Sequence, residues 1–367
     1  MRPMQYTLTV LAVAGCWQPA TSLFKYMMYN AYAMLIILML YTFSMSQFMD
    51  LVLNVSNSDE FTETLYLLLI VLMACYKAIN MNLSHKNVAM IIEYLTESPF
   101  APLDKNEKII REKFDKMVEN NTFWYLVLVL LTCVYIILLS LFTEFRKENL
   151  AYRAWLPFDY SISAIIYYLT YTHQMMSMTL SGIVNLACDS FICGLLLHVS
   201  CQIEILEYRL SKIANNQKNL RNCVYHHNCI FEYAHIVNNK FAKIIAIQFT
   251  VSALVVCSHL YHLAMTSSSV GYIQFVMCIA CMLAAIFYYC WFGNEIKLKS
   301  LQLSDSIYNM EWSRLSNSTK KDLLIIMNRS LTPIEFNSAH ISVNLDSFVM
   351  MLKMSYSIFN LLTQTQD

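Results

Sequence analysis

The chain has 367 residues, of which 57% are hydrophobic and 14% are charged, and its formal net charge is zero. Soluble domains carry nearer a quarter charged residues, so this composition, with a mean hydropathy of +0.44, excludes an ordinary soluble protein. A net charge of zero also gives no reason to expect nucleic acid as a partner. The composition indicates an integral membrane protein.

Uncharged runs long enough to cross a bilayer, which takes about 20 residues, recur along the chain. We predict spans at residues 26–49, 64–82 and 122–143, a long fourth helix from about residue 159 to 210, two spans within residues 244–294 joined by a turn at 266–271, and a seventh span at 339–362. The fourth helix exceeds the thickness of a bilayer, so it should project into the cytoplasm. The predicted fold class is all-α, with seven transmembrane helices.

The orientation follows from the distribution of Lys and Arg, which favour cytoplasmic segments. With the N-terminus in the cytoplasm and the C-terminus outside, the outer loops hold Arg146, Lys147 and Arg153, and nearly all other basic residues are cytoplasmic. This orientation is opposite to that of a G-protein-coupled receptor.

The cytoplasmic segments have helical periodicity and should pack into an anchor domain. We therefore divide the chain into a cytoplasmic N-terminal segment (1–25), spans one to six (26–292), a cytoplasmic anchor region (293–338) and the last helix (339–362).

The outer halves of spans two to six are rich in aromatic, Met and small polar residues, which suit a pocket for a small, mostly apolar molecule. The candidate ligand-binding residues are Tyr66, Ile70, Val134, Ile137, Leu138, Tyr168, Tyr171, Met175, Ser258, Tyr261, His262 and Tyr272. The alternative is that the tyrosines mark the membrane interface, where their amphipathic rings are favoured.

Histidines on the fourth and fifth spans raise the alternative of a membrane zinc hydrolase, which would need three His ligands and a bound water. We expect His173 and His198 at opposite membrane faces, and no carboxylate lies near His259 in the sequence. The twelve cysteines lie mostly in apolar runs and read as small buried hydrophobic residues. We expect no enzyme activity, no metal and no cofactor.

The last span is the least hydrophobic, and Asp346 and Lys353 lie within it. Charged side chains at membrane depth face a protein interior or water, so this helix should line an aqueous path or pair with neighbouring helices. Ile358, Phe359, Leu362 and Thr363, near its outer end, are candidates for an apolar constriction of the kind that gates a pore. One helix lines too little of a pore, so several subunits would be needed.

The C-terminal residues resemble those of the insect odorant receptor family. The matching residues are YYCWFGNEI at 288–296, Ser300, Ile307, Tyr308, Trp312, residues 323–327 (including Leu324), Arg329, Ser330, Pro333, Phe348, Leu352, Lys353, residues 355–357 and Phe359, with Gly15, Cys16, Trp17, Gln18 and Pro19 near the N-terminus. The related gustatory receptors carry Thr-Tyr and then Gln-Phe in the last span, where this chain has Ser355-Tyr356 and Leu362-Thr363. A gustatory-type channel is the close alternative.

The resemblance implies an odorant-gated, non-selective cation channel in the plasma membrane of olfactory neurons, with a small volatile organic ligand. It implies a heterotetramer with the shared odorant co-receptor subunit. Because the long insertion typical of that co-receptor is absent, this chain resembles a tuning subunit. The expected anchor and interface residues are Trp291, Tyr308, Trp312, Leu324, Arg329 and Tyr356. Many members have Gly just before the last span, where this chain has Ser338-Ala339-His340.

Overall fold

The computed structural model describes residues 3–18, 23–54, 57–213, 217–265, 269–338 and 341–364. These residues are almost entirely helical, which confirms the predicted class. The helices are α1 (Gln5–Val13), α2 (Leu23–Leu53), α3 (Ser58–Leu83), α4 (His85–Tyr94), α5 (Lys105–Thr143), η1 (Phe145–Lys147), α6 (Ala164–Ser211), η2 (Gln217–Asn219), α7 (Leu220–Met265), α8 (Ser269–Tyr308), η3 (Trp312–Arg314), α9 (Asn317–Ser330) and α10 (Leu345–Gln364). The strands β1 (Asn337–Ser338) and β2 (Ile341–Ser342) pair antiparallel just before α10.

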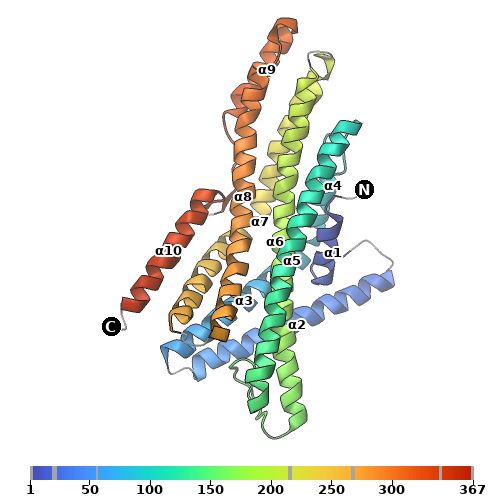
Figure 1. Ribbon diagram of the computed structural model, residues 1–367. Coiled ribbons are helices and arrows are strands. Elements are labelled where there is room, and N and C mark those ends of the chain that lie inside the picture. The colour runs from blue at the N-terminus through green and yellow to red at the C-terminus, as the bar shows by residue number, and fades with distance from the viewer. Residues whose placement is uncertain are drawn as a thin grey trace.

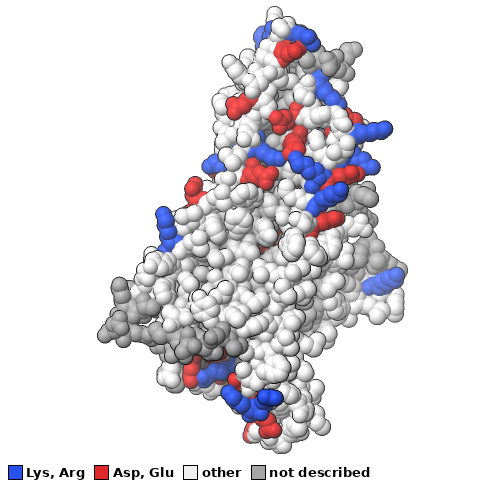
Figure 2. All heavy atoms as spheres, in the orientation of Figure 1, with Lys and Arg blue, Asp and Glu red and all other residues white. Residues whose placement is uncertain are grey.

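Six of the described helices, α2, α3, α5, α6, α7 and α8, are long and apolar enough to cross a membrane. The seventh predicted span corresponds to α10, whose 20 residues include Asp346 and Lys353. Charged side chains gather toward the two ends of the face shown in Figure 2, and a broad uncharged band lies between them. That band is where lipid would surround the bundle.

Helix α6 is the central element of the bundle. It contacts α1, α2, α3, α5, α7 and α8 (Figure 1). Every residue from 186 to 203 is buried, so this stretch is enclosed by protein on all sides. Its 48 residues span about 72 Å at 1.5 Å per residue, which is more than twice the hydrocarbon thickness of a bilayer. This length agrees with the prediction that the helix projects beyond the membrane.

The inner ends of α5, α6, α7 and α8 form the upper part of Figure 1, where ion pairs join α5, α6 and α8. The guanidinium of Arg209 on α6 donates to the carboxylate of Glu107 on α5 at 2.8 and 3.0 Å. The ammonium groups of Lys113 and Lys299 both donate to Glu204. Polar contacts thus connect α5, α6 and α8 on this side of the bundle.

Three boundaries differ from the predictions. Helix α5 begins at Lys105, so the cytoplasmic segment and the third span form one continuous helix. Helix α6 begins at Ala164, a few residues after the predicted start. Helix α10 begins at Leu345 instead of residue 339, because the β1–β2 hairpin occupies the preceding residues and the side chain of Asn344 accepts a hydrogen bond from the Ser347 backbone N–H at 2.9 Å. The predicted turn at 266–271 lies partly outside the described residues.

Candidate functional site

A cavity of about 90 Å³ lies among α3, α5, α6, α8 and the loop between η1 and α6. Its walls are formed by Ile70, Tyr125, Val129, Thr132, Cys133, Ile136, Ile137, Tyr152, Met175, Met178, Thr179, Ser181, Gly182, Asn185, Cys278, Cys281 and Met282. Helical periodicity places one face of α5 and one face of α6 opposite each other here. Gly182 adds free space between these two faces. A Cβ at this position would already be in contact with Val129, because it would lie 3.4 Å from Cγ1 of that residue.

Most of the polar groups in this wall are already hydrogen-bonded within the protein. The hydroxyls of Thr132, Thr179 and Ser181 each donate to a backbone carbonyl of their own helix. The amide nitrogen of Asn185 donates to the Ile70 carbonyl at 3.2 Å. The surface that remains is mainly aliphatic, aromatic and sulfur-containing, which suits a small apolar molecule, and the flexible methionines allow the shape to adapt.

Tyr152, in the loop at residues 148–163, lines the cavity, and this part of the loop is hydrogen-bonded to the bundle. The backbone N–H of Tyr152 donates to the side-chain oxygen of Gln174, and the Gln174 amide donates back to the Tyr152 carbonyl at 3.0 Å. The Gln47 amide donates to the carbonyl of Arg153. The guanidinium of Arg153 pairs with Glu60 at 2.6 Å, and this hydrogen bond raises the pKa of Arg153. The loop is therefore an ordered wall of the cavity.

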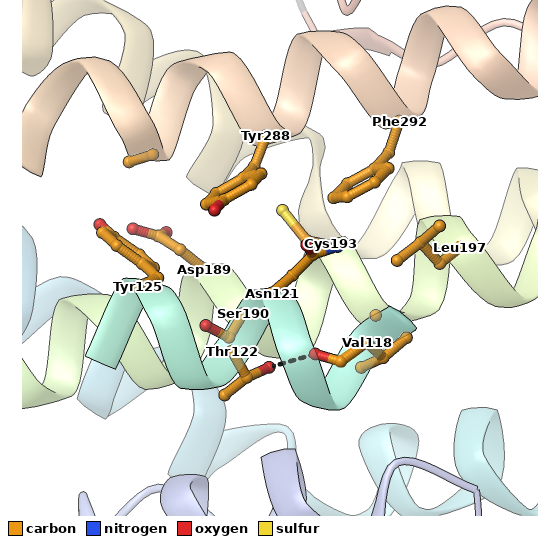
Figure 3. Close-up of a pocket in the computed structure, with 12 residues that line it drawn as sticks. Val118, Asn121, Thr122, Tyr125, Asp189, Ser190, Cys193, Leu197, Tyr288 and Phe292 are labelled. Carbon is orange, nitrogen blue, oxygen red and sulfur yellow. Dashed lines mark hydrogen bonds between the residues drawn. The ribbon is translucent and has the colours of Figure 1, made fainter. Parts of the chain in front are cut away.

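Tyr125 lies at the inner end, where it also lines a second, much smaller cavity of about 10 Å³ (Figure 3). Figure 3 shows Asp189 of α6 beside Tyr125, with Tyr288 opposite them on α8. The volume is about that of one water. Asp189 also accepts two hydrogen bonds. Its Oδ1 accepts from the Lys77 ammonium at 2.6 Å and from the Tyr289 hydroxyl at 2.7 Å. A buried ion pair therefore lies directly inward of the larger cavity.

Three of the twelve predicted ligand-binding residues, Ile70, Ile137 and Met175, line the larger cavity. Tyr66, Tyr171 and Tyr261 are buried without lining it. The Tyr66 ring packs on His259 with centroids 4.3 Å apart, and the Tyr171 hydroxyl pairs with that of Ser140 at 2.8 Å.

The other six predicted ligand-binding residues also lie away from the cavity wall. Val134, Leu138, Tyr168 and Tyr272 are exposed on the outside of the bundle. The Ser258 hydroxyl donates to the Leu254 carbonyl, and His262 contacts the hydroxyl of Thr62 at 3.1 Å.

The histidines do not assemble into a metal site in the part of the chain that the structure describes. His173 pairs with Thr42, His259 with the Val255 carbonyl, and Nε2 of His198 lies 3.3 Å from the carboxylate of Asp115. All twelve cysteines fall in the described ranges, carry free thiols and are buried or half-buried. Their interpretation as small hydrophobic residues is confirmed.

Helix α10 lies at the edge of the bundle, against α7 and α8 (Figure 1). A narrow stripe, Ser347, Met351 and Ser355, is buried against the bundle. Asp346 and Lys353 are seven residues apart on the opposite, exposed face, so the two charges project from one side of the helix. Of the predicted gate residues, Ile358 and Phe359 are half-buried, and the Phe359 ring lies 6.3 Å from that of Tyr356. The side chains of Leu362 and Thr363 lie outside the described residues.

Four of the six predicted anchor and interface residues present large apolar side chains on the surface of this single chain: Trp291, Tyr308, Leu324 and Tyr356. The indole N–H of Trp312 donates to the carbonyls of Ile307 and Tyr308 near the end of α8. The Arg329 guanidinium lies 4.4 Å from the centre of the Phe231 ring and so joins α9 to α7. These two side chains therefore connect elements within the chain.

Long membrane helices around an apolar cavity, beside a peripheral helix with charges on its exposed face, are typical of a polytopic membrane receptor. The family model "7tm Odorant receptor" matches residues 57–356, which is most of the chain. The chain belongs to this family. It is an odorant receptor and not an enzyme.

Individual relatives agree with this assignment. Odorant receptor 46a isoform B of Drosophila melanogaster is 23% identical over 99% of this chain and 98% of its own length. Odorant receptor Or1 of Anopheles gambiae is 20% identical over 98% of this chain and 94% of its own length. The match to isoform A of odorant receptor 46a is 26% identical and spans 60% of this chain and 61% of that protein.

The fold is similar to that of a solved receptor. The structure of the insect olfactory receptor OR5 from Machilis hrabei in complex with eugenol superposes with a TM-score of 0.87 at 18% identity, over 99% of this chain and 97% of that one. A second structure of the same receptor gives a TM-score of 0.87 at 17% identity. The shared fold supports the assignment of α10 as the seventh helix.

Sequence reasoning missed two features of the site. Tyr152 lies on a loop, where no periodicity marks a residue as pointing inward. Lys77 and Asp189 are 112 positions apart, but each is the one Asp, Glu, Lys or Arg within a long stretch of its helix, residues 64–83 for Lys77 and 164–203 for Asp189. Opposite charges at membrane depth are a signal for such a pair.

Proposed function

We propose that this chain is the tuning subunit of an odorant-gated, non-selective cation channel. A small volatile molecule binds in the cavity lined by Ile70, Ile137 and Met175, and binding opens a pore lined by α10. The observation that carries this proposal is the apolar cavity among α3, α5, α6 and α8 of a chain that belongs to the odorant receptor family. The similar receptor OR5 was solved in complex with eugenol, a small organic molecule of the kind such a cavity accommodates.

The exposed face of α10 supports its role in the pore. Asp346 and Lys353 would be unfavourable against lipid, because a charge at membrane depth costs several kcal/mol. Water in a pore removes this penalty. The outer end, with Ile358 and Phe359 and the neighbouring positions 362 and 363, remains our candidate for the gate. Helix α10, which we propose lines the pore, begins at Leu345, inside the predicted segment 339–362.

The exposed aromatic and aliphatic residues of α8, α9 and α10 support assembly with further subunits. Tyr308 is 71% exposed and Leu324 is 54% exposed, although both are apolar enough to favour burial. We propose that the anchor region at residues 293–338 holds a heterotetramer with the shared odorant co-receptor subunit, in the plasma membrane of olfactory neurons.

The proposed mechanism is a shift between closed and open populations. Odorant binding favours whichever state binds it more tightly, and the difference in affinity sets the size of the response. Apolar burial contributes about 25 cal/mol per Å², so a small volatile gains several kcal/mol before the costs of association.

Two adjacent positions on α5 give a matched test. Ile137 lines the cavity, and Leu138 is 48% exposed on the outside of the same helix turn. Ile137→Trp should fill much of the cavity and raise the half-maximal odorant concentration at least tenfold. Leu138→Trp should leave it nearly unchanged. The readout is odorant-evoked current in cells that also express an insect co-receptor, with surface labelling of both variants. Equal effects of the two substitutions would contradict the proposed cavity.

A further inference from the structure

Tyr152 is the loop residue that reaches into the cavity. It lies between η1 and α6, yet only 9% of its surface is exposed. Its backbone is held at both the N–H and the carbonyl by the Gln174 side chain, so the loop is fixed at this position. The ring packs near Phe43 of α2, with centroids 6.0 Å apart, and forms part of the cavity wall. The placement of this side chain is therefore determined by the protein before any ligand binds.

The Tyr152 hydroxyl is buried and has no hydrogen-bond partner among the described residues. A buried polar group without a partner is unfavourable, and an acceptor atom of a ligand placed at this hydroxyl would remove that cost. The hydroxyl is covered by its neighbours, so a ligand reaches it only when one of these side chains moves. An unused donor beside a mainly apolar cavity is a means of selecting ligands.

We infer that Tyr152 is a specificity-determining residue that donates a hydrogen bond to an acceptor oxygen of the odorant. The preferred ligand class is a small apolar molecule with a carbonyl, ether or hydroxyl oxygen, and pure hydrocarbons of the same shape are disfavoured. This inference rests on the proposed function, since it assumes that the cavity is the odorant site.

Two other polar groups of the wall lie at the inner end of the cavity. The Asn185 amide nitrogen is occupied by the Ile70 carbonyl, and its unpartnered Oδ1 is an acceptor. Asn185 is eleven residues along α6 from Gln174, which is about 16 Å. Tyr125, at the same inner end, also lines the small cavity beside Asp189. These groups cannot replace a donor at the outer end.

The test compares two volatiles of nearly equal shape, 2-heptanone and 2-methyl-1-heptene, in which a methylene replaces the carbonyl oxygen. Affinities are measured by thermal stabilisation of the detergent-solubilised full chain. The ratio of ketone to alkene affinity should fall about tenfold in Tyr152→Phe, the size expected when one buried hydrogen bond is lost. Melting without ligand verifies that the variant is folded.

A control variant separates this effect from the loss of any tyrosine hydroxyl. Tyr233→Phe removes a hydroxyl that is also buried and unpartnered among the described residues, but lies on α7 against Phe100, away from the cavity. This variant should keep the wild-type ratio.

The inference is overturned if Tyr152→Phe keeps the wild-type ratio, if Tyr233→Phe lowers the ratio equally, or if neither volatile binds the wild-type chain. Current recordings with the same volatiles test the proposed function separately. A ratio that changes as expected, with no evoked current, would support the role of Tyr152 and contradict the channel.

Discussion

The ammonium nitrogen of Lys77 on α3 lies 2.6 Å from Oδ1 of Asp189 on α6, and both side chains are buried. The Tyr289 hydroxyl of α8 donates to the same oxygen, so three membrane helices meet at one carboxylate. This contact lies immediately inward of the proposed odorant cavity. It joins the helices that form the cavity wall.

Breaking the pair on one side should destabilise the fold strongly. Lys77→Met or Asp189→Leu leaves an uncompensated buried charge, and each should cost about 3–5 kcal/mol. The double variant Lys77→Met/Asp189→Leu removes both charges and should recover most of that loss. Surface labelling and melting of the solubilised protein measure both effects, and Lys86→Met, at an exposed position on α4, is the control. A double variant as unstable as the sum of the single variants would show that the pair is not coupled.

Gly182 should control the size of the odorants that fit. A Cβ there would meet Val129 and Cys133 at 3.4 and 3.5 Å, which are ordinary contacts, so Gly182→Ala should fold normally. It should be more stable by about 0.5–1 kcal/mol, since alanine suits a helix interior better. The added methyl narrows the cavity, and sensitivity to larger odorants should fall about tenfold, with small odorants less affected. A dose–response series across a homologous set of odorants measures this, and an equal loss at every size would count against it.

Gly293 should be required for the position of α10. A Cβ on this residue of α8 would overlap the backbone carbonyl of Val343, just before α10 begins. Gly293→Ala should displace the start of α10 and change basal or maximal current. Binding in the cavity should remain within about threefold of wild type, because Gly293 lies eleven residues, or about 16 Å, along α8 from Met282. Gly182→Ala is the matched control, because it should change the affinity for larger odorants and leave basal and maximal current unchanged. A loss of binding affinity without a change in gating would contradict the assignment.

Lys353 should affect ion permeation if α10 lines the pore. A charge about 10 Å from a passing cation in water repels it by about 0.4 kcal/mol, which corresponds to a factor of about two. Lys353→Gln should therefore raise the inward cation current through single channels about twofold, with an unchanged half-maximal odorant concentration. Lys86→Gln is the control, because it removes an exposed charge on α4, away from α10. If single-channel current is unaltered in both variants, Lys353 does not face the pore.

The positions of most helices along the chain could be predicted because membrane spans depend on local sequence. The charges that flank residues 26–49 and the uncharged stretch at 244–294 mark helices without any knowledge of their partners. The polar character of α10 was equally visible in Asp346 and Lys353. The β1–β2 hairpin was not, since two-residue strands leave no periodic signal.

The cavity was only partly predictable, because its wall depends on how each helix is rotated. Ile137 and Leu138 are both apolar and adjacent, but they differ by about 100° around the helix and only one faces inward. Tyr152 enters from a loop whose position depends on Gln174, and the partner of Lys77 lies on another helix. Such contacts are set by tertiary packing, which one sequence does not specify.

The most direct test of the account is current in membrane patches excised from cells that express this chain together with an insect odorant co-receptor. Excision removes the cytosolic nucleotides on which G-protein signalling depends. We predict cation-carried channel openings within milliseconds of applying an effective volatile, and a loss of that response in Ile137→Trp but not in Leu138→Trp. Odorant responses that occur in intact cells and disappear on excision, with the protein present in the patch, would contradict a directly gated channel.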